Sequence, residues 1–152
     1  VILLTVLVGS GTYNGAGSAF LNRVLAGGRA DPWAFLLKMA FTALTLGAGF
    51  RGGEIVPTFF IGAAFGSAVA PLLGLEPAFG AAVGLIALFC GVVNCPLASI
   101  LLSVELFGGG SIVFFALACA LSYLLSGRFS LYSSQKLVYS KLEPRYIDAS
   151  AR

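Results

Sequence analysis

Long apolar runs, separated by short clusters of glycine, proline and polar residues, make up most of the chain. Such runs are typical of helices, and the glycine and proline clusters mark where a helix begins or ends. Residues 9–28 are rich in Gly, Ser, Thr and Asn, which predicts a loop with a short helix. The pattern predicts longer helices over residues 33–48, 55–73, 78–93, 97–107 and 111–125, and a final short helix over 133–142.

Asp31 and Pro32 directly precede the helix predicted to begin at Trp33. A carboxylate is a favourable N-cap, and proline is tolerated in the first turn because its missing N–H has no partner there. We therefore expect Asp31 to cap this helix.

Several of the predicted helices are too short for a straight membrane crossing. A crossing needs about 20 residues, because each residue rises about 1.5 Å and the hydrocarbon layer is about 30 Å thick. Residues 97–107 fall well short of that length. Helices that stop inside a membrane are tolerated where protein or water satisfies their backbone, and they are typical of transporters. The pattern favours ion handling over simple anchoring.

Small residues recur at the spacing of helix packing. Gly62 and Gly66 are four residues apart, and so are Gly80 and Gly84. This spacing puts small residues on one face of a helix and lets two backbones approach closely. We interpret these glycines as packing positions and not as part of a pore.

Composition identifies the environment of these helices. Hydrophobic residues make up 59% of the 152 positions and charged residues 10%, against about 25% charged residues in soluble domains. A chain this apolar cannot cover a surface that faces water, so lipid is its expected surroundings. The sequence predicts an all-α, polytopic membrane protein in which residues 1–152 form a single transmembrane domain.

Charged residues are concentrated near the carboxyl end. Residues 53–127 contain no Lys or Arg, and five basic residues follow, namely Arg128, Lys136, Lys141, Arg145 and Arg152. The positive-inside rule places this end, with a tail over residues 143–152, in the cytoplasm. The tail is short and of mixed charge, which gives no support to nucleic-acid binding.

The chain opens on a run of apolar residues without Met, and we expect it to be a fragment of a longer protein.

The sequence offers no candidate metal site or cofactor site. It contains no histidine, and the spacing of Cys90, Cys95 and Cys119 matches no zinc motif. Because these cysteines lie in apolar surroundings, we interpret them as small packing residues.

The most informative stretch is the glycine-rich segment 49–53, which leads into the apolar helix predicted from Ile55. The first N–H groups of a helix have no partner within it, and the helix dipole places about half a positive charge there. Such a helix start binds an anion without a cationic side chain. The Walker pattern requires Gly-Lys-Ser/Thr, whereas this segment reads Gly-Glu-Ile, so a nucleotide loop is excluded. An ordinary glycine turn remains the alternative.

Three motifs in order resemble those of CLC chloride channels and transporters. Residues 52–57, Gly-Gly-Glu-Ile-Val-Pro, resemble the family's G-x-F-x-P motif. Residues 94–100, Asn-Cys-Pro-Leu-Ala-Ser-Ile, followed by Val104-Glu105, resemble its R-A-P-L-T-G-I run and V-L-E. Leu131-Tyr132-Ser133 resembles its tyrosine segment. Together these motifs cover roughly residues 33–142 and match the second of two inverted halves of the family's helical fold.

The resemblance implies an anion site made of Gly53, Glu54, Ile55, Val56 and Tyr132. In the family, backbone N–H groups after the motif glycine and a tyrosine hydroxyl bind the central anion. The resemblance also implies a homodimer formed through residues 97–125, in a multi-pass membrane protein of the bacterial inner membrane.

Two residues depart from the chloride-type motif. Glu54 stands where an apolar residue is common, and it resembles the G-G-E-V-T-P motif of the bacterial fluoride-transporting branch. Val56 lacks the Thr hydroxyl of that branch. The substrate therefore stays open between chloride and fluoride, and the mechanism between a channel and an anion/proton antiporter. We interpret Glu54 as an acidic residue favoured by the helix dipole, with proton coupling as its alternative role.

Two other functions remain as alternatives. A membrane-embedded hydrolase would use Ser99 or Ser103 as nucleophile, but the apolar region holds no histidine and no serine–lysine pair that would activate it. The second alternative is a helical scaffold that does not conduct.

Overall fold

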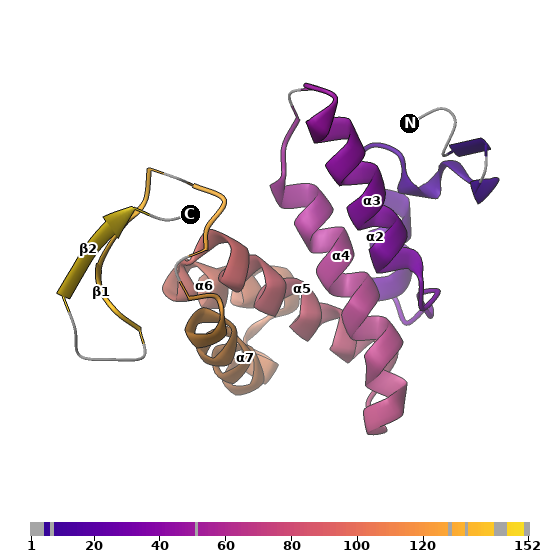
Figure 1. Ribbon diagram of the computed structural model, residues 1–152. Helices are drawn as coiled ribbons and strands as arrows, with labels where there is room; N and C mark the ends of the chain where they lie inside the picture. Colours follow the sequence, from indigo (N-terminus) through magenta and orange to yellow (C-terminus); the bar gives the residue numbers. More distant parts are fainter. Residues whose placement is uncertain are drawn as a thin grey trace. The chain divides into compact units, whose positions relative to one another are not determined.

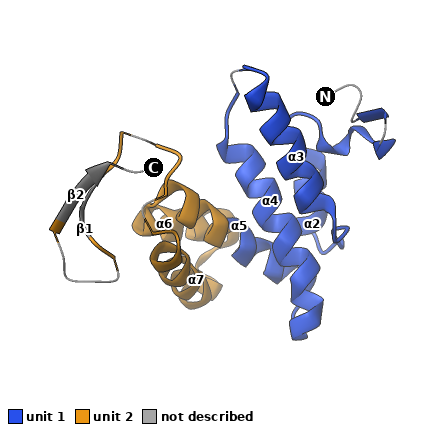
Figure 2. Ribbon diagram, viewed as in Figure 1, with its two compact units in different colours: residues 1–85 blue, residues 86–152 orange. Residues whose placement is uncertain are grey.

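A computed structural model describes residues 5–6, 8–50, 52–127, 129–132, 134–141 and 146–150. The chain divides into two compact units, residues 1–85 and residues 86–152 (Figure 2). The helices and strands are η1 Gly11–Tyr13, α2 Ser18–Leu25, α3 Ala34–Gly47, α4 Ile55–Val69, η2 Ala70–Leu73, α5 Pro77–Val93, α6 Pro96–Phe107, η3 Gly109–Ser111, α7 Ile112–Leu125, β1 Lys136–Tyr139 and β2 Tyr146–Ser150. The α-helices and strands are labelled in Figure 1.

The five long helices confirm the predictions from the apolar runs to within two residues, apart from a change to 3-10 geometry at the end of 55–73 and at the start of 111–125. Of the described helices, only Ile55–Leu73 has the length and apolar composition needed to cross a membrane. Helix α6 has 12 residues and is therefore about 18 Å long.

In the first unit, α4 packs against both α2 and α3. The contact is built on aromatic rings, because Phe60 of α4 is fully buried and stacks on Phe20 of α2, with 4.1 Å between ring centroids. Tyr13 of η1 adds a second ring contact to Phe60, at 6.1 Å. This aromatic cluster fixes the loop that precedes α2 against the centre of α4.

The glycines at four-residue spacing bring α4 against the first half of α5. A Cβ on Gly62 would lie 2.5 Å from the carbonyl oxygen of Gly84, closer than real side chains come. A Cβ on Gly66 would overlap the carbonyl oxygen of Gly80. The prediction that these glycines are packing positions is therefore confirmed.

In the second unit, α6 packs against α7, and the later part of α5 is tied to α7. Phe115 and Cys119 of α7 are buried, together with Cys90 of α5. The hydroxyl of Ser122 donates to the carbonyl oxygen of Ala87, at 2.6 Å. This bond satisfies a serine inside an apolar helix without requiring water.

Two predictions are wrong, one of a short helix near the carboxyl end and one of the residue that caps α3. Residues 136–139, predicted to belong to a helix over 133–142, form strand β1, which pairs in antiparallel fashion with β2. The stretch contains Val138 and Tyr139, which favour strands, and a distant partner strand supplies its hydrogen bonds. Asp31 does not cap α3, because the helix begins at Ala34 and its N-cap, Trp33, makes no side-chain capping bond.

Candidate functional site

The chain between α3 and α4 turns at a glycine. The N–H of Gly49 donates to the carbonyl oxygen of Leu46, and the N–H of Phe50 donates to that of Thr45. These two bonds form a Schellman motif, which requires the positive φ of 83° that Gly49 adopts. The helix therefore ends sharply, and the chain is free to start α4 a few residues later.

The amino end of α4 carries N–H groups without a partner in the described part of the chain. Glu54 is the N-cap, but its carboxylate makes no capping bond. Its carbonyl oxygen accepts the first bond of the helix, from the N–H of Thr58 at 3.2 Å. No described acceptor is bonded to the N–H of Glu54, Ile55 or Val56. Three N–H donors at the positive end of a helix are suited to an anion.

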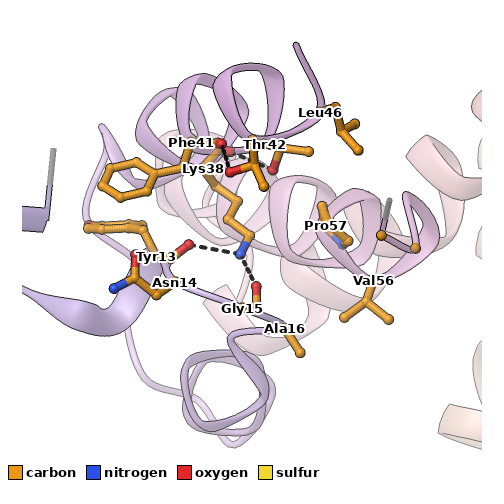
Figure 3. A pocket seen from close by; sticks show the side chains of 13 residues that line it. Tyr13, Asn14, Gly15, Ala16, Lys38, Phe41, Thr42, Leu46, Val56 and Pro57 are labelled. Atoms are coloured by element: carbon orange, nitrogen blue, oxygen red, sulfur yellow. Dashed lines mark hydrogen bonds between the residues drawn. The ribbon is translucent and has the colours of Figure 1, made fainter. Parts of the chain in front are cut away.

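A cavity of about 380 Å3 lies beside this helix start, within the first unit (Figure 3). It is lined by residues of η1, the following loop, α3 and the start of α4, namely Tyr13, Asn14, Gly15, Ala16, Lys38, Phe41, Thr42, Thr45, Leu46, Gly52, Gly53, Val56 and Pro57. Most of this wall is apolar, and the hydroxyls of Thr42 and Thr45 donate to the carbonyl oxygens of Lys38 and Phe41.

Among the described residues that line the cavity, Lys38 is the one cation. It is also the one charged residue of α3 and is 2% exposed. Sequence reasoning missed this residue, although a single lysine within an apolar run is the signal that would have found it.

The predicted site residues fall in two places. Gly53 and Val56 line the cavity, and Glu54 and Ile55 form the helix start next to it. Tyr132 belongs to the second unit and lies between α7 and β1, with its side chain 47% exposed. Ser133, which completes the tyrosine motif, lies outside the described residues.

The segment that carries Tyr132 is attached to the end of α5. The N–H of Leu131 donates to the carbonyl oxygen of Val92 at 2.9 Å. The side-chain amide of Asn94 donates to the carbonyl oxygen of Phe129 at 3.0 Å. The position of Tyr132 is thus set by α5 as well as by the preceding helix.

Lys141 reinforces this attachment from the other side of Tyr132. Its ammonium donates to the side-chain oxygen of Asn94, to the carbonyl oxygen of Tyr123 at 2.8 Å and to the hydroxyl of Ser126 at 2.8 Å. Burial lowers the pKa of this ammonium, because partial removal from water disfavours its charged form. The charged form of Lys141 is therefore stabilised by these acceptors. Asn94 forms hydrogen bonds to the segments before and after Tyr132.

Within the described residues, no group of three or more His, Cys, Asp or Glu side chains is placed to hold a metal ion. The described polar groups at the cavity are instead the Lys38 ammonium, backbone N–H groups and the side chains of Tyr13, Asn14, Thr42 and Thr45.

Comparisons with known proteins agree with the motifs. The model of the voltage gated chloride channel family matches residues 1–127. A chloride/fluoride channel protein of Pseudomonas syringae pv. tomato is 47% identical over 110 residues, which are 72% of this chain and 24% of that protein. The crystal structure of a CLC-type fluoride/proton antiporter is 34% identical, with a TM-score of 0.82 over 86% of this chain and 33% of the antiporter.

The chain thus spans about a quarter to a third of the length of these relatives. The structural match covers most of its helices, and the family match covers all of them. The chain belongs to the voltage-gated chloride channel (CLC) family.

Proposed function

We propose that the protein containing this chain carries fluoride or chloride across a membrane, and that the amino end of α4 binds the anion in transit. Members of the family are multi-pass membrane transporters. The observation that carries the proposal is the set of N–H groups at Glu54, Ile55 and Val56, which have no acceptor among the described residues and lie at a helix start that borders a cavity. Partial charges attract an anion without holding it as tightly as a full charge would, so the anion can leave again.

Of the two anions, we propose fluoride as the substrate that the protein prefers. Both relatives carry fluoride in their names, and the Gly-Gly-Glu sequence at residues 52–54 resembles the motif of the fluoride branch. Tyr132 would donate its hydroxyl to the same anion, and Glu54 would set the field at the helix start or take part in proton coupling.

The first test is transport by the full-length protein in liposomes. We expect fluoride efflux to be faster than chloride efflux, and to be accompanied by proton movement if the protein is an antiporter. Matched vesicles carrying a variant with Ile55 replaced by Pro, which removes one N–H, serve as the control. Because proline is well tolerated in the first helical turn, we expect this variant to fold and to bind the anion less tightly. If the unaltered protein moves neither anion, the proposed function is wrong.

The proposed function includes a homodimer formed through residues 97–125, with the carboxyl end in the cytoplasm of a bacterial cell. Large side chains of α6 and α7 that are more than half exposed support an apolar contact surface, and they are Leu97, Leu101, Val113, Phe114, Leu117, Leu121 and Leu125. Lipid or a second copy of the chain would cover them.

Replacing Leu101 with Trp is expected to weaken this dimer, because the larger ring disturbs a closely packed contact. The oligomeric state of the full-length protein in detergent, measured by light scattering, reports the effect. Leu72→Trp is the matched control, since Leu72 is 84% exposed and lies outside the proposed contact. A Leu101→Trp protein that stays dimeric at low concentration would argue against this interface.

A further inference from the structure

Lys38 is a buried charge that the proposed anion site does not yet use. Its ammonium donates to the carbonyl oxygen of Tyr13 at 3.0 Å and to that of Gly15 at 2.6 Å (Figure 3). It also lies 5.0 Å from the centre of the Phe60 ring. An ammonium has three N–H donors, so these two bonds leave one without an acceptor among the described residues.

The charge of Lys38 has no counter-charge in the described part of the chain. Both of its hydrogen-bond acceptors are neutral carbonyl groups, and no described carboxylate forms an ion pair with it. A buried ion without an opposite charge is costly, and proteins pair such ions or place them where they act. A mobile anion would supply the missing charge.

That charge and the start of α4 line the same cavity. Lys38 lines it together with Gly53 and Val56, and the rest of the wall is largely apolar. The Thr42 and Thr45 hydroxyls already donate to backbone carbonyls. The donors that can face an anion are therefore the Lys38 ammonium, the N–H groups at the start of α4 and the polar side chains of Tyr13 and Asn14, and among these the ammonium alone carries a full charge. A volume of about 380 Å3 also accommodates a small anion with several waters, since each water occupies about 30 Å3.

We propose that Lys38 is the fixed positive charge of this cavity and draws a small monovalent anion, fluoride or chloride, to the amino end of α4. The two carbonyl oxygens offset part of the charge, so the anion is concentrated there without being trapped. This inference rests on the proposed transport function and assigns the residue that determines anion affinity.

Three substitutions in the full-length protein separate the effect of the Lys38 charge from the effect of its hydrogen bonds to the loop carbonyls. Lys38→Gln keeps N–H donors for the loop carbonyls but removes the charge. Lys38→Met removes both, and Lys38→Arg keeps both. If Lys38 acts through its charge, the half-saturating anion concentration rises about tenfold in Lys38→Gln and Lys38→Met, whereas Lys38→Arg stays within about threefold of the unaltered protein. The maximal rate changes less than the half-saturating concentration in each case.

A second measurement leaves Lys38 unchanged and does not depend on the folding of its variants. A cysteine placed at Ala16, which is exposed and lines the cavity, is treated with anionic and cationic thiol reagents of equal size. A positive cavity makes the anionic reagent react faster, and added fluoride slows it. The same protein without the Ala16→Cys change corrects for reaction at the native cysteines.

The outcomes distinguish this inference from the proposed function. If the unaltered protein transports anions but Lys38→Gln keeps its affinity, or both thiol reagents react equally fast, the assignment of Lys38 is overturned and the function stands. Restoration of affinity by Gln but not by Met would show a purely structural role and would also overturn the assignment. If the unaltered protein transports no anion, the proposed function itself fails.

Discussion

Replacing Gly66 with Leu is expected to abolish folding of the full-length protein, whereas the same change at Gly47 is expected to leave it folded. A side chain on Gly66 would overlap the carbonyl oxygen of Gly80 and would approach the Cα of Gly84 to 3.2 Å. These are backbone atoms, so no side-chain rotation relieves the overlap. Overpacking costs about 1–3 kcal/mol where neighbours can adjust, and we expect a larger cost here.

Gly47 is the matched control because it also lies in a helix, α3, but its Cβ position meets no atom within 4 Å. The yield of monodisperse protein in detergent and its melting temperature measure both variants. Similar melting temperatures for Gly66→Leu and Gly47→Leu would show that the α4–α5 contact is not as close as described.

Replacing Asn94 with Gly is expected to destabilise the protein and to weaken anion binding together. The Asn94 side chain donates to the carbonyl oxygen of Phe129 and accepts bonds from Ser126 and Lys141. Glycine suits the positive φ of 62° at this position, so the change removes the side chain without backbone strain. Loss of bonds to a partly buried ammonium and a carbonyl is expected to cost about 2–3 kcal/mol.

The effect on anion binding follows from the proposed role of the Tyr132 hydroxyl as an anion ligand. The Asn94 bonds attach the segments before and after this residue, so their loss allows the Tyr132 hydroxyl to move. Fluoride affinity and thermal stability, both measured on the full-length protein, test the two halves of the prediction.

A double-mutant cycle of Asn94→Gly with Lys141→Met tests whether the Asn94–Lys141 hydrogen bond accounts for the loss of stability and of anion affinity. Residues joined by a hydrogen bond show a coupling energy of about 0.5–3 kcal/mol, whereas independent residues add. Asn94→Asp is the matched control, because it keeps an acceptor for Lys141 and loses only the donor to Phe129. Strict additivity of Asn94→Gly and Lys141→Met would contradict a shared role in positioning Tyr132.

The apolar runs predicted the long helices well, because a helix surrounded by lipid or protein satisfies its own backbone and must be apolar along its whole length. The prediction of a helix failed at residues 136–139, where β1 forms. A strand depends on a partner, and the partner here is β2, Tyr146–Ser150. The residues of β1 alone do not predict that it pairs with β2.

Sequence alone also led to the proposed anion site, since the first N–H groups of an apolar helix that follows glycines have no partner within that helix. A single lysine within an apolar run was the available signal for Lys38, but the bonds of its ammonium to the Tyr13 loop are evident only once α3 and that loop are packed together. The sequence also did not connect Asn94 with Lys141, which are 47 residues apart.

The chain's residue order determined its membrane character, the limits of its helices and the family motifs, because these depend on local composition and periodicity. Packing decided which polar groups face a cavity and which are satisfied by protein. Burial and charge compensation are sums over neighbours from distant segments, so only the folded arrangement shows that an ammonium without a counter-charge among the described residues lines the same cavity as the start of α4.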